Sequence, residues 1–503
     1  MLEKPVNKTK TIFYYIGIVI LTLGALQTIP AVTSLFYKEW QIAIIFLFTA
    51  SISAIVGTSF MLIGFRNRRA SLSFGEGMVV AAGAWFLGTL LCALPYCLSG
   101  NYISYLDCCF DVMSGLTTTG LTLIQDMDHI SNGINMWRHI LTYVGGQGIV
   151  VLALAFLTKD ASGAYKMYVG EAKDERLFPN AVSTARQIWH ISILYLVIGS
   201  IVMSIAALHA GIKGDRAVLH GIWIFMSAWS TGGFAPMSQN VLYYHSTFFE
   251  LTTVIFFVIG SFNFALHHAV LSGNRRELRK NIETVTFSIT LTILVLLTCI
   301  GLMRNNTYPD MAALFRKGFY QLISGHTTTG FMTIYAKQFY YEWGDIALFA
   351  ITISMLLGGS ACSTAGGFKG LRTGIIFSTF KTEIKRMMLP ESRISCQKIH
   401  HIKDVVLTDT VIKSAFLIVF AYIITFTLGT LAGMLAGFPF DMAAFESASV
   451  TGNVGLSIGV TSVGMPAFLK FTYIIIMWLA RLEFMSVLAL GAFFIRKARK
   501  SCN

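Results

Sequence analysis

The chain has 503 residues, of which 55% are hydrophobic and only 13% are charged, and this composition is typical of a protein with many membrane spans. Its formal net charge is +13. Because the basic residues lie in polar connections between apolar segments, they serve to orient the chain in a bilayer, and no role in binding nucleic acid is needed.

Two apolar segments come first, at about 12–36 and 42–65, and each has the ~20 apolar residues that a bilayer core requires. Lys4, Lys8 and Lys10 precede the first segment as in a secretory signal, but the apolar run is too long for one and has no small-residue cleavage site. We therefore expect residues 1–70 to form a two-span pair that stays in the protein and ends at a basic cluster, Arg66-Asn-Arg-Arg69.

Four longer units follow the leading pair, and each has the same expected order of a span, a short pore helix, a polar loop and a returning span. The units are expected at 75–157, 185–272, 283–380 and 411–496. Their polar loops share a frame in which a Ser is followed six positions later by a Gly and then by a bulky apolar residue. The loops lie at 114–121, 227–234, 324–331 and 449–456.

A polar loop between two membrane spans has a non-helical backbone, which must face protein or a water-filled lumen rather than lipid. Glycine reaches positive φ without steric cost, so successive carbonyl oxygens can point at one axis and replace the hydration shell of a cation. One such loop alone is also compatible with an ordinary turn, but four in register favour an ion filter. The expected filter residues are Thr118, Thr119, Gly120, Thr231, Gly232, Gly233, Thr328, Thr329, Gly330, Asn453, Val454 and Gly455.

With these loops, nearly the whole chain resembles the Trk/Ktr/HKT superfamily of cation transporters. The leading two-span pair is similar to that of TrkH-type members and is absent from the shorter Ktr type. The resemblance implies an all-α polytopic membrane protein with four fused membrane-pore-membrane repeats in pseudo-four-fold arrangement around one pore. It also implies potassium uptake. Sodium-preferring relatives have Ser at the first filter glycine, so Gly120 argues against them.

The returning span of the third unit is interrupted by a glycine-rich run, 358–367, followed by Lys369 and Arg372. Each interior Gly costs a helix about 1 kcal/mol relative to Ala, so we expect irregular backbone here, with Lys369 and Arg372 reaching cytoplasmic water. The resemblance implies an intramembrane gating loop at 358–370, a small-residue packing face being the alternative. The expected gating residues in this loop are Gly358, Gly359, Gly366, Gly367 and Lys369.

Arg481 and Glu483 place two charges at membrane depth in the last span, where a charge generally faces a cavity or a partner. The resemblance implies that Arg481 lies below the filter and forms the barrier to permeation together with the gating loop. The alternative is an Arg481–Glu483 bridge that only ties helices. For Asp107 and Asp111, near the first pore helix, a cation-attracting mouth and a capping or salt-bridging role are both open.

Several residue types that suggest other chemistry do not form a site in the sequence. The eight cysteines are scattered without a CxxC pair, and the adjacent His267 and His268 point to different helix faces with no carboxylate beside them. No phosphate-binding loop, catalytic triad or haem motif occurs. We therefore expect no transition metal, no cofactor in this chain and no enzyme, and a membrane-embedded enzyme remains only a remote alternative.

With the N-terminus inside, ten spans place every short basic connection on the cytoplasmic face, so both termini are expected there, in a bacterial inner membrane. The polar segments 158–186 and 381–409 are the candidates for contact with a soluble partner, and His400-His401 in the second could sense pH. The resemblance implies a homodimer on a TrkA-type cytosolic ring through which NAD or ATP/ADP would act. A sodium-permeable or sodium-coupled potassium transporter is the alternative function.

Overall fold

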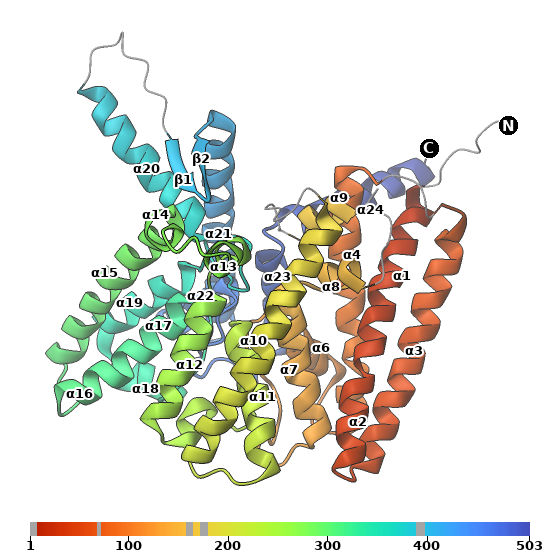
Figure 1. Cartoon of the computed structure of the whole chain (residues 1–503), viewed down its shortest axis with the longest axis horizontal. Coiled ribbons are helices and arrows are strands. Elements are labelled where there is room, and N and C mark those ends of the chain that lie inside the picture. The colour runs from red at the N-terminus through yellow and green to blue at the C-terminus, as the bar shows by residue number, and fades with distance from the viewer. Residues whose placement is uncertain (1–7, 68–71, 157–163, 172–179, 389–397, 503) are drawn as a thin grey trace.

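The computed structural model describes residues 8–67, 72–156, 164–171, 180–388 and 398–502. Within them, six helical segments are long and apolar enough to cross a membrane (Figure 1). They are α1 with α2 (Lys8–Leu26 and Thr28–Phe36), α3 (Trp40–Gly64), α4 with α5 (Phe74–Cys92 and Leu94–Ser99), α10 (Ala181–His209), α15 (Ile282–Arg304) and α21 (Asp409–Leu435). The expectation of an all-α protein with many membrane spans is confirmed.

Three further segments are helix pairs with a sharp bend. The bend is 80° between α7 (Asn132–Gln147) and α8 (Ile149–Phe156), 101° between α12 (Thr247–Gly260) and α13 (Phe264–Leu271), and 111° between α23 (Ala467–Arg481) and α24 (Met485–Cys502). The one remaining expected span, the returning segment of the third unit, consists of a 13-residue helix, α19 (Gly344–Leu356), followed by irregular backbone and α20 (Gly370–Met387). All four returning segments are thus interrupted, whereas the sequence led us to expect only one interruption.

A shorter helix precedes each of the four polar loops. These helices are α6 (Tyr105–Leu116), α11 (Asp215–Trp229), α17 (Tyr320–His326) and α22 (Phe440–Gly452). Helix α17 follows α16 (Met311–Leu314) and a π-helical turn, Phe315–Phe319. Two of the helix starts are capped by side chains, because Ser104 accepts from the amide of Asp107 at 3.2 Å and Asp310 accepts from the amide of Ala313 at 2.6 Å.

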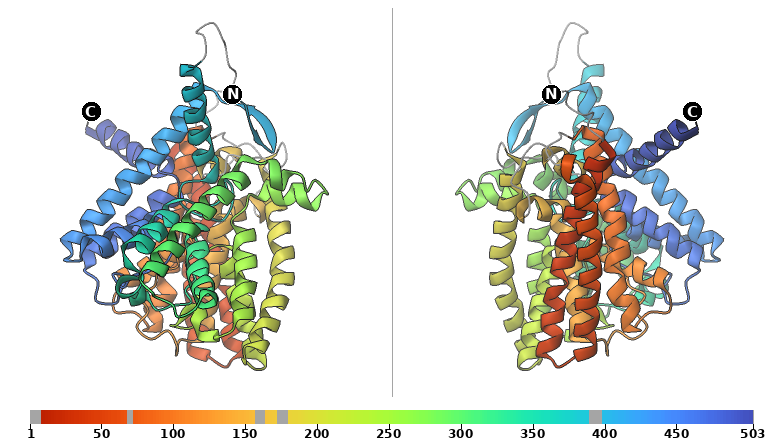
Figure 2. Two further views of the ribbon diagram at one scale, coloured as in Figure 1. Left: turned by 90° about the vertical axis from the view of Figure 1, so that its left-hand side faces the viewer. Right: turned by 90° about the vertical axis from the view of Figure 1, so that its right-hand side faces the viewer.

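The leading pair packs through small residues, as membrane helices do where their backbones approach closely. Helices α1 and α3 lie side by side in Figures 1 and 2, and a Cβ built on Gly17 would come within 2.6 Å of the carbonyl oxygen of Gly57. One turn beyond α1, the Thr49 hydroxyl donates to Gln27 Oε1 at 2.7 Å. The pair therefore forms a tightly packed unit at one edge of the bundle.

One element was not expected from the sequence. Residues that we read as an irregular polar connection contain a two-stranded antiparallel hairpin, β1 (Lys398–His401) and β2 (Lys403–Val406), beside the bundle end of α20 and α14 (Glu277–Lys280). The remaining short elements are α9 (Ala164–Gly170), α18 (Ala336–Tyr341) and the 3-10 turns Phe65–Asn67 and Asn240–Tyr244. Parts of the expected partner-docking and basic segments, at 68–69, 158–163, 172–179 and 389–397, lie outside the described residues.

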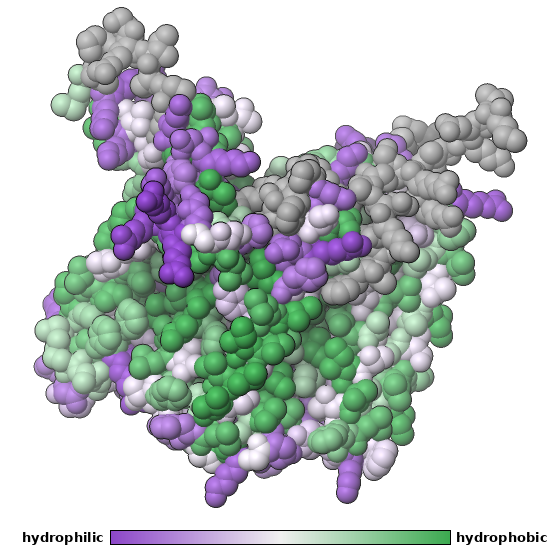
Figure 3. All heavy atoms as spheres, viewed as in Figure 1, coloured by the Kyte–Doolittle hydropathy of each residue, from purple (hydrophilic) through white to green (hydrophobic). Residues whose placement is uncertain are grey.

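Hydrophobic and hydrophilic side chains are separated on the surface of the bundle, as expected from the apolar composition of the chain. Hydrophobic side chains cover the middle of the bundle, and hydrophilic ones gather toward its two ends, most densely around α20, the hairpin and α14 (Figure 3). A belt of this kind is what a protein presents to hydrocarbon with polar caps in the two aqueous layers. The core that carries the four loops lies inside this belt.

Candidate functional site

The four predicted filter loops have the same local hydrogen bond. In each, the backbone carbonyl of the frame Ser, inside the helix that leads to the loop, accepts from the amide five residues later. The donors and distances are Thr119 to Ser114 (2.7 Å), Gly232 to Ser227 (2.8 Å), Thr329 to Ser324 (2.8 Å) and Val454 to Ser449 (2.8 Å). Each loop is therefore held to the end of its own helix in one register.

The backbone of each loop adopts left-handed φ at two matched positions. The first is a non-glycine residue: Thr118 (+57°), Thr231 (+50°), Thr328 (+55°) or Asn453 (+51°). The second, two residues later, is the glycine: Gly120 (+84°), Gly233 (+68°), Gly330 (+82°) or Gly455 (+99°). Left-handed φ is unfavourable for Thr, and strained backbone of this kind clusters at functional sites. The divergent fourth loop repeats the same conformation with Asn, which tolerates it better than Thr does.

The four loops close into a ring. A Cβ built on Gly120 would lie 2.4 Å from the carbonyl oxygen of Gly232. A Cβ built on each of the other three glycines would likewise lie against a carbonyl oxygen of the next loop in chain order. Gly233 meets Thr329 O at 2.3 Å, Gly330 meets Val454 O at 2.0 Å, and Gly455 returns to Thr119 O at 2.0 Å. No side chain fits at these four positions, so glycine is required by the close approach of neighbouring loops as well as by φ.

A cavity of about 200 Å³ opens over one end of this ring, lined by three of the ring glycines, Gly120, Gly233 and Gly455. Arg138 also lines it, fixed by hydrogen bonds from Nη1 to Ala235 O at 3.1 Å and to Asn135 Oδ1 at 3.2 Å. The cavity gives an approach to the ring from this end.

The first pore helix carries Asp107 and Asp111, and the structure gives both a role in packing rather than at the mouth. Asp107 is fully buried and pairs with Lys470 of α23 at 2.6 Å. Asp111 is also fully buried and accepts from the amide of Leu123 at 2.6 Å and the hydroxyl of Thr122 at 2.7 Å. The geometry therefore favours the capping or salt-bridging alternative, with a salt bridge at Asp107 and hydrogen bonds to the following loop at Asp111.

Arg481 lies at the other end of the ring, at the end of α23. Its Nη2 donates to the carbonyls of Gly145 at 2.6 Å and Gly146 at 3.0 Å, and its Nη1 donates to the carbonyl of Thr364 at 2.7 Å. Nη1 also lies 3.4 Å from the hydroxyl of Thr118, in the first filter loop. One guanidinium thus connects α7, the predicted gating loop and the filter.

Residues 357–369, which we call the intramembrane loop, form irregular backbone against the underside of the ring. The Thr364 hydroxyl lies 3.2 Å from that of Thr231 in the second filter loop, and the Gly366 amide donates to Thr328 Oγ1 in the third at 2.7 Å. A Cβ on Gly366 would lie 2.1 Å from Gly452 O, beside the fourth loop. The intramembrane loop and Arg481 together contact all four filter loops.

The ends of the intramembrane loop are fastened to each other and to a carboxylate. The amide of Gly358 donates to Phe368 O at 2.9 Å, and that of Gly370 donates to Gly359 O at 2.9 Å. Buried Glu283, in the first turn of α15, accepts from the amides of Ala361 at 2.6 Å and Leu371 at 3.2 Å through Oε1. The loop therefore has one well-defined conformation, fixed by these hydrogen bonds.

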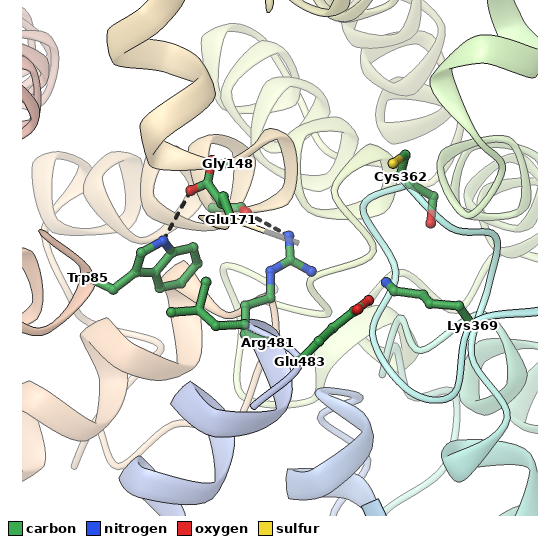
Figure 4. Close-up of a pocket in the computed structure, with 10 residues that line it drawn as sticks. Trp85, Gly148, Glu171, Cys362, Lys369, Arg481 and Glu483 are labelled. Atoms are coloured by element: carbon green, nitrogen blue, oxygen red, sulfur yellow. Dashed lines mark hydrogen bonds between the residues drawn. The ribbon is translucent and has the colours of Figure 1, made fainter. Parts of the chain in front are cut away.

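Lys369 and Arg372 were expected to reach cytoplasmic water, and the structure places both side chains in the interior instead. Lys369 is buried and donates to Ala365 O, so it does not reach water, and in Figure 4 its ammonium lies toward Glu483. Glu483 pairs with Arg372 in a two-pronged ion pair rather than with Arg481. The 111° bend after Arg481 explains the exchange, because it turns Glu483 away from its neighbour in the sequence and toward α20.

The space between these groups is small. A cavity of about 20 Å³ lies among Trp85, Glu171, Lys369, Arg481 and Glu483 (Figure 4), which is room for about one water molecule. Glu171 accepts from the indole of Trp85 at 3.0 Å and from two amides at the start of α8. Sequence reasoning missed the contacts of Thr364, Glu171 and Glu283 and the ion pair of Arg372, because in each case the partner is remote in the chain.

The histidines that attracted attention in the sequence have structural partners. His267 Nε2 lies 3.0 Å from the carbonyl of Ile259, across the bend between α12 and α13. His400 in the hairpin lies between Asp404 at 2.7 Å and Glu277 at 3.0 Å, and these two hydrogen bonds raise the pKa of His400 above its ordinary value. Among the residues that the structure describes, no group of three His, Cys, Asp or Glu side chains could hold a metal ion.

The comparisons with known proteins agree on one family. Residues 43–497 match the TrkH family, described as a cation transport protein. An uncharacterized cation transporter of Methanocaldococcus jannaschii is 31% identical over 488 residues, covering 96% of this chain and 95% of its own length. The Trk system potassium uptake protein TrkG of Escherichia coli is 29% identical over 93% of this chain and 94% of its own.

A solved structure is similar over the same extent. The crystal structure of the potassium transporter TrkH from Vibrio parahaemolyticus superposes with a TM-score of 0.80 at 25% identity, covering 96% of this chain and 98% of that one. The family match and the superposition both extend across the four loops and the intramembrane loop. The ring described above therefore lies in a part of the fold that this chain shares with cation transport proteins.

Proposed function

The chain belongs to the TrkH family of cation transport proteins, and from this premise we propose that it takes up potassium across the cytoplasmic membrane through the ring of four loops. The ring closure carries the proposal. The four loops share the same pair of left-handed positions, and each glycine lies against a carbonyl of the next loop. In such an arrangement, backbone oxygens surround one axis. Carbonyl rings of this kind replace the hydration shell of a monovalent cation.

The ion path in this proposal uses four sets of three residues. They are Thr118, Thr119 and Gly120; Thr231, Gly232 and Gly233; Thr328, Thr329 and Gly330; and Asn453, Val454 and Gly455. In the fourth set, Asn453 Nδ2 donates to the Thr119 hydroxyl at 3.1 Å and to Met477 O at 3.2 Å. Asn453 therefore braces the first loop, and the four sets contribute unequally to ion binding.

We propose that the intramembrane loop and Arg481 are the gate, and that the structure corresponds to its closed state. The hydrogen bonds from Arg481 to Thr364, Gly145 and Gly146 support this, because they seal the underside of the ring with a fixed positive charge. A cation leaving the ring would meet that charge in surroundings with little water. Opening requires the intramembrane loop to move so that Thr364 and Gly366 no longer lie under the filter loops.

The other members of the assembly are part of the same proposal. The names of relatives refer to a Trk system, and we infer a cytosolic TrkA-type ring as the partner, through which NAD or ATP/ADP acts on a homodimer of this chain. The basic end of the bundle, with the hairpin and α20, is proposed as the cytoplasmic face where that ring docks. Both termini are then cytoplasmic, and this chain itself needs no cofactor.

A sodium-permeable or sodium-coupled transporter is the second candidate. One feature of the chain argues against it, the glycine at position 120, where a side chain would meet the carbonyl of Gly232. A Ser at this site would push the ring open on one side and change its fit to potassium. An enzymatic role is not supported, since the family that the chain belongs to is one of transport proteins.

The test is growth at limiting potassium of a host without its own potassium uptake, expressing this chain with a TrkA-type subunit. Gly330→Ser should abolish growth or make it sodium-sensitive, because its Cβ would lie 2.0 Å from Val454 O. Gly437→Ser is the matched control: its φ is also positive, at +92°, but nothing lies within 4 Å of the added Cβ. If membrane-inserted wild-type chain gives neither growth nor rubidium uptake while sodium enters, potassium is the wrong ion.

A further inference from the structure

An apolar groove of about 460 Å³ lies on the outside of the bundle, away from the ring and the gate. Its walls come from three helices, α1, α4 and α24, and Trp478 of α23 forms its deep end, 5.6 Å from the ring of Phe86. Almost all of the lining side chains are hydrophobic. Along α1 the lining extends from Thr9 to Ile16, a rise of about 10 Å at ~1.5 Å per residue.

A second, polar cleft of about 650 Å³ continues from this groove and shares Thr9, Val79, Phe493 and Lys497 with it. Its other lining residues include Lys8, Glu76 and Arg496. Lys8 pairs with Glu76 at 3.0 Å, whereas neither Arg496 nor Lys497, both exposed, has a carboxylate partner among the described residues. The groove is thus apolar at depth and carries two unneutralised cations at its rim.

The bend after α23 produces this geometry. Because α24 turns by 111° from α23, it runs across the basic end of the bundle, as Figures 1 and 2 show. Its hydrophobic residues line the groove and its basic residues follow at the far end, which is the pattern of a helix that lies in a membrane interface. Gly491 faces open space, with nothing within 4 Å of an added Cβ, so the missing side chain helps to form the groove.

We propose that this groove is a binding site for one anionic phospholipid, with an acyl chain along α1 and α4 and the phosphate headgroup against Arg496 and Lys497. The length of the apolar part suits an acyl chain, because half of a hydrocarbon core is about 15 Å thick. Basic pockets between membrane helices select anionic headgroups. A second copy of this chain fits less well, since a two-fold contact through this surface would bring the same cations together.

Trp478 provides the measurement. Of the eight tryptophans only Trp40 is largely exposed, at 62%, and Trp478, which is 7% exposed, is the one that lines the groove. In a Trp40→Phe background, the part of the quenching that depends on Trp478 therefore reports on the groove. The protein is reconstituted in vesicles in which either phosphatidylglycerol or phosphatidylcholine carries brominated acyl chains, at constant total bromine. The same protein with Trp478→Phe is the blank, because the difference in fluorescence quenching between the two proteins is the part that comes from Trp478.

We expect brominated phosphatidylglycerol to associate about five- to tenfold more strongly than brominated phosphatidylcholine, since one basic residue near an anionic surface is worth roughly fivefold. Arg496→Gln with Lys497→Gln should remove this preference. The control Lys385→Gln with Arg386→Gln, which removes two exposed cations from α20, should leave it unchanged. Gly491→Phe should reduce quenching by both lipids, whereas Gly491→Ala should not.

Equal quenching by the two lipids, or a preference that survives loss of Arg496 and Lys497, would overturn the proposal. A second copy of the chain as the occupant is also an outcome of the test: in that case Gly491→Phe would shift the oligomeric state measured by light scattering in detergent. If Gly491→Phe prevents folding, the double variant Arg496→Gln with Lys497→Gln still tests the proposal. Both of these side chains are exposed, so replacing them should not disturb folding.

Discussion

Replacing Arg481 with Gln is expected to increase cation flux through the closed protein. The guanidinium donates to Thr364, Gly145 and Gly146, so it both fastens the intramembrane loop and places a positive charge under the ring. Gln keeps a hydrogen-bonding group of similar reach but no charge. The substitution therefore lowers the electrostatic part of the barrier and loosens the loop.

The size of the effect can be worked out from the charge alone. A potassium ion about 5 Å from the guanidinium, at an effective dielectric constant of ~20, is repelled by about 3 kcal/mol. Since 1.4 kcal/mol corresponds to a factor of ten in rate, removing the charge should raise flux about a hundredfold. Loss of the hydrogen bonds to the intramembrane loop adds to this in the same direction.

The assay is uptake of radioactive rubidium into proteoliposomes that contain the purified chain without any partner. Arg481→Lys is the matched control, because it keeps the charge but cannot present the planar fork that reaches three carbonyls. We expect Lys to raise flux much less than Gln does. Unchanged flux in the Gln variant, or equal flux in the Lys and Gln variants, would refute the electrostatic barrier.

Three further outcomes follow from contacts outside the ring. Glu283→Gln weakens the anchor of the intramembrane loop, so rubidium leak should rise several-fold while Arg481 remains in place, as flux assays would detect. Because the pKa of His400 is raised, its contribution to docking of the hairpin is present below pH ~6.5 and is lost as pH rises through the raised pKa. Protection of the hairpin amides from hydrogen exchange, measured relative to the intrinsic exchange rate at each pH, should therefore fall at high pH, and His400→Gln should remove this pH dependence. Asp107→Asn leaves the buried Lys470 without its carboxylate partner, which should lower the free energy of unfolding by about 3–5 kcal/mol. Adding Lys470→Met should restore part of that loss, as measured by thermal unfolding.

The filter loops could be predicted from the sequence because their geometry is local. The Ser carbonyl, the amide five residues later and the glycine all belong to one short segment, so a repeated frame reveals a repeated conformation. Even the divergent loop at Asn453 follows the pattern, since Asn replaces Thr at the left-handed position and the glycine keeps its place. The roles of these loops in transport remain a prediction that the growth test addresses.

The contacts around the proposed gate could be predicted less completely, because they join residues that are remote in the sequence. Arg372 and Glu483 are 111 positions apart, and Asp107 and Lys470 are 363 apart, so neither pair follows from spacing. The bends in the returning segments decide which side chains meet, and only the glycine-rich one was evident in the sequence. The alternative of an Arg481–Glu483 bridge does not hold, because the turn of the chain after α23 directs Glu483 to Arg372.

Arg481 lies where several carbonyl groups already converge. Helix α7 ends beside the ring with the carbonyls of Gly145 and Gly146 directed at the guanidinium, and the Thr364 hydroxyl lies 2.9 Å from the last carbonyl of α12, that of Gly260. The C-terminal ends of membrane helices carry partial negative charge and coordinate cations. In the gate that we propose, the guanidinium therefore lies where a cation would bind, and it would block the path by occupancy as well as by repulsion.

This reasoning makes a prediction that repulsion alone does not. In Arg481→Ala, millimolar guanidinium ion added on the basic side of the bundle should enter the vacated carbonyl site and reduce rubidium flux, whereas tetramethylammonium, which cannot donate hydrogen bonds, should not. The control is Glu283→Gln, which leaks but keeps the Arg481 side chain in place, and guanidinium should have little effect on it. If guanidinium blocks both variants equally, its site is elsewhere in the path and the carbonyls below the ring do not form a cation site.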